Sequence, residues 1–303
     1  MSILFALVGA TGIGKSRLSL ELAEKFNAEI IGVDSRQIYK GFAIGTAQPP
    51  QSDMARVRHH HIDFLEPTSV YSAGDFCSFV KELVDSNASR NYILVGGTGM
   101  YLQSLLLGLP QIPKVDPAIR KEFEQISIDQ GNVSLYEMAK KADPEAMTSV
   151  EPNNVQRIVR ILEVWKATGR KLSEWQKMRE GGIGNLPVFW LNRSRENLYA
   201  RIDTRVDQMM KDGWMDEIRS LAKTVPLDAP AWQSLGYREL LTANSASEVS
   251  RVLDEVKRKT RNYAKRQLTW FRWQMETIAV DLDSDADPVQ TIASHIPARK
   301  IIV

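Results

Sequence analysis

The sequence has very little cysteine, little net charge and no long apolar run. Cys77 is the only cysteine among 303 residues, which excludes a disulfide framework and a zinc site built on cysteines. The formal net charge is only +2, so any surface for a nucleic acid must be local. The apolar start, residues 3–8, is too short for a membrane span and lacks the basic flank of a signal peptide. We therefore expect a soluble protein in a reducing, cytoplasmic location.

A phosphate-binding pattern, G-x-x-x-x-G-K-[ST], is present near the start of the chain. Its residues are Gly9, Ala10, Thr11, Gly12, Ile13, Gly14, Lys15 and Ser16. Residues 3–8 predict a buried strand before it, and residues 17–26 follow with helical periodicity. In such a strand–loop–helix unit, backbone N–H groups, the lysine and the helix N-terminus face a polyphosphate, and the Ser16 hydroxyl can bind Mg²⁺. A glycine-rich turn that matches by chance is the alternative, and the pattern does not identify the phosphate compound.

Two further predicted strands end in segments that suit a functional site. Residues 29–33 are followed by Asp34, and residues 92–95 are followed by a glycine-rich segment, 96–99. Functional groups gather at the carboxyl ends of strands in open α/β sheets, so we expect Asp34 near the phosphate loop. Asp34 could instead cap a following helix. The glycine segment could be a tight turn or a place of close approach to a ligand, and both choices stay open on the residues alone.

A run of three histidines, residues 59–61, invites the interpretation of a metal site. Consecutive side chains point in different directions, however, and no cysteine or spaced histidine completes a ligand set. We therefore expect no metal ion at these residues.

From residue 110 the pattern changes. Residues 109–113 predict a linker, and the stretch up to residue 184 is mostly helical in pattern, including a helix over 155–167 that ends before Gly169. We expect an α/β fold with a parallel sheet flanked by helices, formed by residues 1–112 and 196–303. A strand at 186–192 rejoins the sheet, and residues 113–195 form a mostly helical inserted domain.

Two predicted helices toward the carboxyl terminus carry clustered cations. Residues 201–221 predict one amphipathic helix, with Arg201 and Arg205 one turn apart. Residues 251–273 predict another helix. Four of its cations lie within about 60° of each other on a helical wheel, and we call them the basic stripe. The basic stripe consists of Arg258, Arg261, Lys265 and Arg272. With aromatic residues interleaved, it favours a polyanion partner such as a nucleic acid, whereas a solvated helix face is the alternative and usually carries acidic partners four residues away.

Together these segments resemble the tRNA dimethylallyltransferases, also called tRNA isopentenyltransferases. The matching blocks, in the family's order, are GATGIGKS (9–16), DSRQIYKGFAIGTAQP (34–49), YSAGDF (71–76), LVGGTGMY (94–101), NVQRIVRILEVWKATG (154–169), RIDTRVDQM (201–209), SLGYREL (234–240) and TRNYAKRQLTWFR (260–272). Ile13, Glu151 and Asn154 depart from the residues that the family usually has there.

The resemblance implies a P-loop NTPase-like core with a helical insertion. The implied reaction moves a dimethylallyl group from dimethylallyl diphosphate to N6 of adenosine 37, beside the anticodon, in tRNAs that read codons beginning with U. By this resemblance Asp34 would be the base, Thr11 a neighbouring hydroxyl and Arg201 a diphosphate contact. The phosphate-loop pattern itself assigns Lys15 to the diphosphate and Ser16 to Mg²⁺. We expect a monomer that binds the tRNA anticodon stem-loop.

The resemblance also implies a set of tRNA-contacting positions, to which the basic stripe adds Arg258 and Arg261. The implied positions are Asp34, Ser35, Arg36, Gln37, Thr98, Arg120, Gln156, Arg157, Ile158, Val159, Arg160, Gln233, Arg238, Lys265, Arg266 and Arg272.

Three other functions share part of this pattern. A prenyltransferase acting on free AMP, ADP or ATP would use the same core, but it would not need the basic stripe. A small-molecule kinase with a P-loop predicts ATP hydrolysis or phosphoryl transfer. A pure RNA-binding module would leave Lys15 and Asp34 unexplained.

Overall fold

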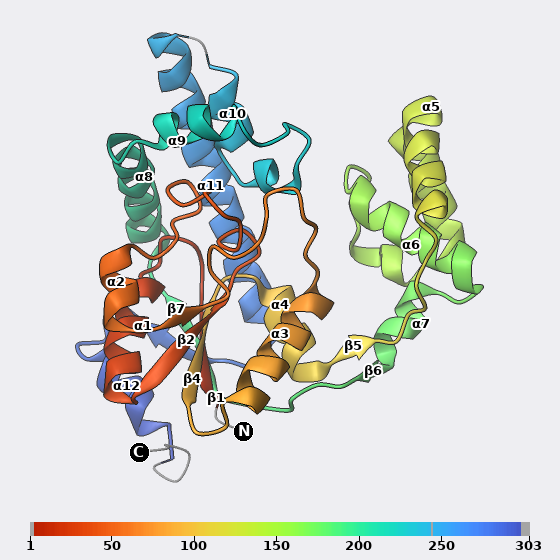
Figure 1. Cartoon of the computed structure of the whole chain (residues 1–303). Helices are drawn as coiled ribbons and strands as arrows, with labels where there is room; N and C mark the ends of the chain where they lie inside the picture. The colour runs from red at the N-terminus through yellow and green to blue at the C-terminus, as the bar shows by residue number, and fades with distance from the viewer. Residues whose placement is uncertain (1–2, 244, 298–303) are drawn as a thin grey trace. The chain divides into compact units, whose positions relative to one another are not determined.

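The computed structural model describes residues 3–243 and 245–297 of the chain (Figure 1). It divides into two compact units, of which the larger spans Met1–Gln103 and Asn185–Val303 and the smaller spans Ser104–Gly184. The inserted unit thus begins and ends earlier than the 113–195 that we predicted. The reason is that Leu105 O and Leu106 O accept hydrogen bonds from the backbone of residues 183 and 184, while residues 188–192 join the sheet of the larger unit.

The larger unit is built on one six-stranded sheet. Its strand order is β3-β2-β4-β1-β7-β8, and every neighbouring pair is parallel. The carboxyl ends of these strands therefore meet at one edge, which confirms the predicted α/β class. The strands are β1 (Ile3–Val8), β2 (Ala28–Val33), β3 (His59–His60), β4 (Asn91–Gly96), β7 (Val188–Asn192) and β8 (Ile278–Asp281).

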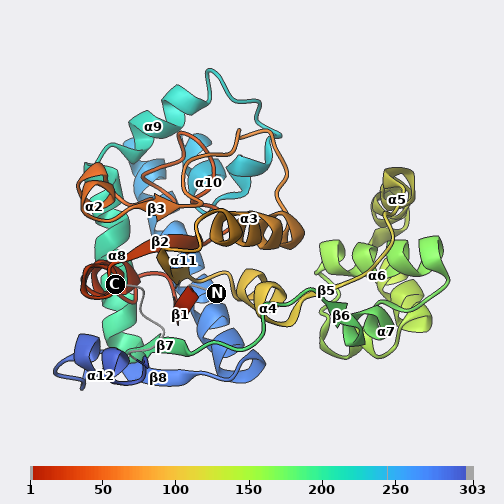
Figure 2. The ribbon, with the colours of Figure 1, turned by 60° about the horizontal axis from the view of Figure 1, so that its bottom comes forward.

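Helices flank this sheet on both faces. Figure 2 looks along the sheet and shows α1 and α12 on one face and α3 and α4 on the other. Side chains of α1 and α12 share one apolar core with β1, β4 and β7, which includes Leu22, Ile292, Phe5, Ile93 and Phe189. The helices of this part of the chain are α1 (Lys15–Lys25), α2 (Gln51–Arg56), α3 (Ala73–Ser86), α4 (Gly99–Leu107), α8 (Arg195–Lys211), α9 (Trp214–Leu221), α10 (Tyr237–Leu241), α11 (Ala246–Gln274) and α12 (Pro288–Ser294), with a 3₁₀ turn at Pro230–Gln233.

The single helix predicted over 201–221 is wrong. It is two helices, α8 and α9, and the chain turns between them at Gly213. Gly213 has φ 95°, a left-handed conformation that costs glycine little and other residues more.

Among the described residues, no helix is both long and apolar enough to cross a membrane.

A second core fixes the loop that follows β2. It contains Tyr39 and Phe42 of that loop together with Trp214, Trp232 and Tyr237. The carboxylate of Glu217 on α9 accepts hydrogen bonds from the backbone N–H groups of residues 43 and 44 (3.0 and 2.8 Å) and from the Tyr237 hydroxyl (2.6 Å). The loop after Asp34 is therefore anchored to α9 and α10.

We expect Glu217→Ala to destabilise the larger unit by roughly 1–3 kcal/mol, because it leaves two loop N–H groups and a buried tyrosine hydroxyl without their acceptor. Chemical denaturation would measure this change. Asp216→Ala is the matched control, because the Asp216 side chain is 86% exposed and pairs only loosely with Arg219. Equal stability of the two variants would show that Glu217 does not anchor the loop.

The smaller unit is mostly helical, as predicted. Its core includes Phe123, Leu135, Ile161 and Leu162. The predicted helix over 155–167 is α6, and it ends before Gly169, which has φ 67°. The elements of this unit are β5 (Leu109–Pro110), α5 (Pro117–Ala142), a 3₁₀ turn (Ala146–Ser149), α6 (Val155–Thr168), α7 (Leu172–Lys177) and β6 (Arg179–Glu180), with β5 and β6 paired antiparallel.

Candidate active site

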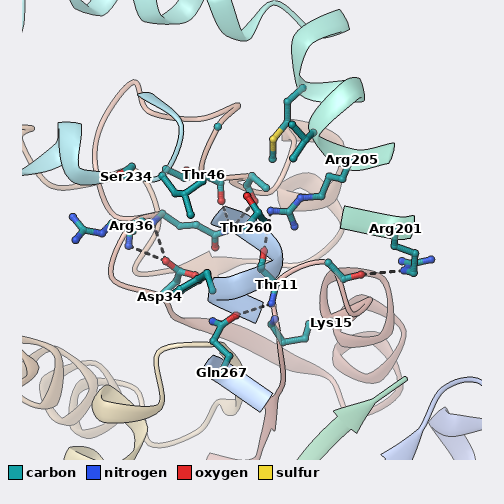
Figure 3. A pocket seen from close by; sticks show the side chains of 18 of the residues that line it. Thr11, Lys15, Asp34, Arg36, Thr46, Arg201, Arg205, Ser234, Thr260 and Gln267 are labelled. Atoms are coloured by element: carbon teal, nitrogen blue, oxygen red, sulfur yellow. Dashed lines mark hydrogen bonds between the residues drawn. The ribbon is translucent and has the colours of Figure 1, made fainter. Parts of the chain in front are cut away.

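A cleft of about 1170 Å³ opens at the carboxyl ends of β1, β2 and β4 in the larger unit (Figure 3). Five segments line it: the phosphate loop, residues 34–37, residues 45–47, helix α8 and helix α11, with residues 233–235 completing the wall. The cleft therefore collects residues from segments far apart in the sequence: Thr11 and Gln267, which both line it, are 256 positions apart.

The phosphate loop has the predicted strand–loop–helix setting, because β1 ends at Val8 and α1 begins at Lys15. Ile13 is fully buried in the sheet core, which explains how an apolar residue is accommodated at this position of the loop. Two arginines from other parts of the chain bond to carbonyls of the loop: Arg193 Nε donates to Ile13 O and Arg201 Nε donates to Gly12 O, both at 3.0 Å.

Lys15 lies inside the cleft. Its Nζ donates to Gly9 O and Ala10 O, each at 2.9 Å. Burial lowers the pKa of Lys15 to about 8; the nearby Asp34 carboxylate opposes this shift and the Arg205 guanidinium adds to it. Ser16, next to it at the start of α1, is exposed and lines the cleft.

Thr11 is held by two side chains that the sequence did not assign. Arg205 Nη2 donates to Thr11 Oγ1 at 3.0 Å, and Thr11 N donates to Gln267 Oε1 at 2.8 Å. Figure 3 shows Arg205 pointing toward Thr11, with Arg201 farther along α8. Arg201 is exposed, whereas Arg205 is partly buried. Arg205 is therefore better placed inside the cleft than Arg201, and the one-turn spacing of the two arginines was the sequence signal for it.

Asp34 does not cap a helix, so that alternative is wrong. Its Oδ1 accepts hydrogen bonds from Arg36 N (2.8 Å) and Gln37 N (3.3 Å), which closes a turn, and the next helix begins only at Gln51. Within the described residues, Asp34 Oδ2 accepts no hydrogen bond. The carboxylate lines the cleft, so one of its oxygens is free to accept a hydrogen bond or a proton from a bound group.

The glycine segment after β4 packs against protein. The N–H groups of Gly97 and Thr98 donate to Val33 O (3.2 and 3.1 Å), and Ser35 N donates to Thr98 Oγ1 (3.1 Å). A Cβ atom at Gly97 would lie 2.3 Å from Gln267 Nε2. The segment is thus a tight turn that lets α11 and the end of β2 approach closely.

The three consecutive histidines have separate partners. His59 Nδ1 lies 2.8 Å from Val57 O, His60 Nε2 lies 2.6 Å from Glu29 Oε2, and His61 Nδ1 lies 2.8 Å from Gly32 O. The three rings therefore do not converge on one point.

Several residues that the resemblance implied for tRNA contact lie at the cleft. Ser35, Arg36, Gln37, Gln233 and Arg266 line it. The Gln37 amide is already used within its own loop, where Nε2 donates to Thr46 O and Ala47 O. Thr98 accepts the bond from Ser35 described above, and Arg238 is exposed on α10.

In the smaller unit, two of the implied positions are corrected. Ile158 and Val159 are 0% and 1% exposed and belong to its apolar core, so their side chains cannot contact RNA. The other implied positions are at the surface: Gln156 and Arg157 are exposed on α6, and Arg120 and Arg160 both pair with the buried Glu163 (3.6 and 2.7 Å). Asn154 caps α6 by accepting from Arg157 N (3.3 Å), and Glu151 is exposed.

Two cations of the basic stripe on α11, Arg258 and Arg261, have acidic partners. Arg261 is bound to the Asp203 carboxylate on α8 (2.5 and 2.7 Å), and Arg258 lies 3.9 Å from Glu255. The acidic partner of Arg261 comes from another helix, so spacing along α11 alone does not reveal it. Lys265 and Arg272 are exposed, and within the described part of the chain neither has an acidic partner.

Comparisons with known proteins match this chain along nearly its whole length. The model of a family described as IPP transferase matches residues 37–274. The tRNA dimethylallyltransferase of Fusobacterium nucleatum is 38% identical over 291 residues, which covers 94% of each chain. That of Bacillus subtilis is 37% identical over 301 residues and covers 97% of this chain and 96% of the relative.

Two solved structures are also similar. The tRNA isopentenylpyrophosphate transferase of Bacillus halodurans has a TM-score of 0.70 at 35% identity, covering 99% of this chain and 97% of that one. A eukaryotic dimethylallyltransferase acting on tRNA has a TM-score of 0.77 at 27% identity, covering 98% and 81%. Because these matches include most of the segments that form the cleft, and because the parallel sheet and phosphate loop agree with them, this chain belongs to the IPP transferase family.

Proposed function

We propose that the chain transfers a dimethylallyl group from dimethylallyl diphosphate to the N6 amine of adenosine 37 in tRNA. The observation that carries the proposal is the meeting, in one cleft, of a phosphate loop with a carboxylate that has a free oxygen. A phosphate loop suits a diphosphate leaving group, and a free carboxylate suits an amine nucleophile. These two features suit the reaction that the relatives' names describe. The proposed transfer does not require ATP.

The donor end of the cleft stabilises the leaving group. Negative charge grows on the bridging oxygen as the allylic carbon departs from the diphosphate, and fixed cations and N–H groups lower the energy of that state. Lys15 and Arg205 line this end, with Arg201 at its outer edge. Since Lys15 now bonds to the loop's own carbonyls, a diphosphate would replace these carbonyls as its partner.

Mg²⁺ fits the same end. This ion is usually held by few protein oxygens together with substrate phosphates and waters, and the exposed hydroxyl of Ser16 lies next to Lys15 in the cleft. When bound, it would neutralise part of the diphosphate charge.

The acceptor end activates a weak nucleophile. The adenine exocyclic amine is poorly nucleophilic because its lone pair is delocalised into the ring, so a carboxylate that accepts its hydrogen bond and then its proton speeds the attack. Asp34 Oδ2 is available for this role. A stacked base cannot enter such a cleft, so the adenosine must be extruded from its loop. Residues 233–235 and Arg266 also line the cleft.

An anticodon stem-loop of tRNA is the acceptor that the surface favours over free AMP. Exposed cations continue along α11 beyond the cleft, at Lys265 and Arg272, and the smaller unit presents Arg157 and Gln156. A free nucleotide would have no use for them, because they lie outside the cleft. We propose that the chain binds tRNA as a monomer.

The test offers radiolabelled dimethylallyl diphosphate and Mg²⁺ with tRNA, an anticodon stem-loop, AMP or ATP in turn. We expect efficient labelling of tRNA, weaker labelling of the stem-loop and little labelling of AMP, because base extrusion draws on RNA contacts. Efficient labelling of AMP would favour the free-nucleotide prenyltransferase, and turnover of ATP without a prenyl donor would favour a kinase.

Diphosphate binding is expected to take up protons above pH 8. Lys15 has a pKa of about 8 in the free cleft, and an anion beside it raises that pKa toward the ordinary lysine value. At pH values between these two pKa values, the complex holds more protons than the free protein. The affinity for diphosphate therefore falls as the pH rises through this range. Calorimetry at pH 8.5 in buffers of different ionisation enthalpy measures the uptake. Lys15→Arg, which keeps its proton throughout, should abolish the uptake, and an unchanged uptake in that variant would assign it to another group.

Removing an exposed cation of α11, Lys265 or Arg272, should weaken tRNA binding and reduce its salt dependence. For Lys265→Ala or Arg272→Ala we expect the slope of log K against log salt to fall by roughly one per residue. Arg258→Ala is the comparison on the same helix, because Arg258 already has Glu255 nearby, and its effect should be smaller. Unchanged slopes for Lys265 and Arg272 would show that this face is merely solvated.

A further inference from the structure

Gln267 is a buried polar residue on the otherwise apolar side of α11. It is 7% exposed, and Val256, Ala264 and Phe271 share this buried side of the helix. Both ends of its amide are used: Oε1 accepts from Thr11 N at 2.8 Å, and Nε2 donates to Gly97 O at 2.9 Å. A buried amide is costly unless it is hydrogen-bonded, so the two bonds hold the side chain in one orientation.

One bond reaches the phosphate loop, and the other reaches the turn that holds the segment carrying Asp34. Thr11 belongs to the phosphate loop, and its hydroxyl accepts from Arg205. Gly97 belongs to the turn after β4. The N–H group of Gly97 donates to the carbonyl oxygen of Val33, the residue just before Asp34. Figure 3 shows Gln267 directed toward Thr11 from α11.

The turn also supports the other side of Asp34. Thr98, which follows Gly97, accepts a hydrogen bond from Ser35 N. The turn therefore bonds to the residues on both sides of Asp34. Since a Cβ at Gly97 would lie 2.3 Å from Gln267 Nε2, a side chain there would exclude the amide from its present position.

We propose that Gln267 is a positioning residue for prenyl transfer, which sets the phosphate loop at Thr11 against the segment that holds Asp34. This inference rests on the proposed function. Transfer requires the leaving group and the amine nucleophile to be aligned within a fraction of an ångström, and a shift of about 1 Å can cost ~10²-fold in rate. Gln267 is the bridge between the two halves of that alignment, and it belongs to the same helix as the exposed Lys265 and Arg272.

The first experiment removes both bonds with a side chain of similar size. We expect Gln267→Met to lower the single-turnover rate by about 10–100-fold, with the dissociation constants for tRNA and for dimethylallyl diphosphate changing much less. Thr11→Ala keeps the backbone N–H that donates to Gln267 Oε1, so Gln267→Met should slow transfer in the Thr11→Ala background as well. A wild-type rate for Gln267→Met would overturn the proposal.

Phe271→Leu is the matched control. Phe271 is buried on the same side of α11 but packs without bonding to the phosphate loop. It should lower the melting temperature while leaving the single-turnover rate close to that of the wild type. A rate loss equal to that of Gln267→Met would mean that the helix needs only its packing, and the proposal would fail.

A second variant tests the bonding itself through pH. In Gln267→Glu, a protonated carboxyl can accept from Thr11 N and donate to Gly97 O, whereas the ionised form places negative charge against that carbonyl oxygen. The rate of this variant should therefore fall as pH rises, over a range in which the wild-type rate does not fall and circular dichroism shows that the variant stays folded. A pH profile parallel to that of the wild type would contradict the two-bond arrangement.

Hydrogen exchange separates failure of this inference from failure of the proposed function. The Thr11 amide should exchange faster in Gln267→Met than in the wild type or in Phe271→Leu. This readout needs no substrate, so it remains valid if the wild type transfers no prenyl group to tRNA. Unchanged protection of the Thr11 amide would show that Gln267 does not hold the loop.

Discussion

Replacing Asp34 with asparagine is expected to lower the single-turnover rate of transfer by roughly 10²–10⁴-fold, the usual contribution of a general base. The asparagine oxygen can still accept from Arg36 N and Gln37 N, so the turn after β2 should persist and the melting temperature should change little. What the amide cannot do is take the proton from the adenine amine. Rapid-quench measurement of labelled tRNA determines the rate.

Asp63→Asn is the matched control for this prediction. Asp63 also accepts a backbone hydrogen bond, from Gly41 N at 3.1 Å, but it does not line the cleft. That variant should keep both the rate and the stability of the wild type. A near-normal rate together with a large loss of stability in Asp34→Asn would show that Asp34 only closes its turn.

Lys15→Ala should lower the rate by about 10²–10³-fold, which is typical when one group that stabilises transition-state charge is removed. The Lys15 ammonium is held inside the cleft among loop carbonyls, and no other lysine lies in the phosphate loop. Binding of tRNA should be nearly unchanged, because the exposed cations of α11 and of the smaller unit are untouched.

The control for Lys15 lies on the same helix. Lys25 is exposed in the last turn of α1. Lys25→Ala therefore removes the same positive charge at the end of α1 that is remote from the phosphate loop. Its rate should match that of the wild type. If Lys15→Ala and Lys25→Ala had equal rates, the phosphate loop would not grip the leaving group.

Local patterns were enough to predict the phosphate loop and four strands of the sheet, β1, β2, β4 and β7, but they missed β3 and β8. The buried strands at 3–8, 29–33 and 92–95, the phosphate loop and the helix ended by Gly169 all depend on residues close together in the chain, and the structure has them within one or two residues. Gly213 shows the limit of such patterns: the amphipathic period continues across it, so the break between α8 and α9 depends on a backbone conformation that periodicity does not encode.

The pairings between distant segments could not be predicted in this way. Gln267 bonds to Thr11 across 256 positions, and Arg205 bonds to Thr11 across 194. Spacing along one helix also made Arg261 look unpaired, whereas its carboxylate partner, Asp203, comes from α8. A periodic pattern places a side chain on a face, but only the packed fold decides what lies opposite it.

The most direct test of the account is the mass of adenosine 37 in tRNA from a strain that lacks this chain. Returning the wild-type chain should restore the mass of the dimethylallyl group on that nucleoside, and returning the Asp34→Asn chain at equal abundance should restore almost none of it. An unmodified adenosine 37 in the presence of the wild-type chain, or full modification with Asp34→Asn, would contradict the account.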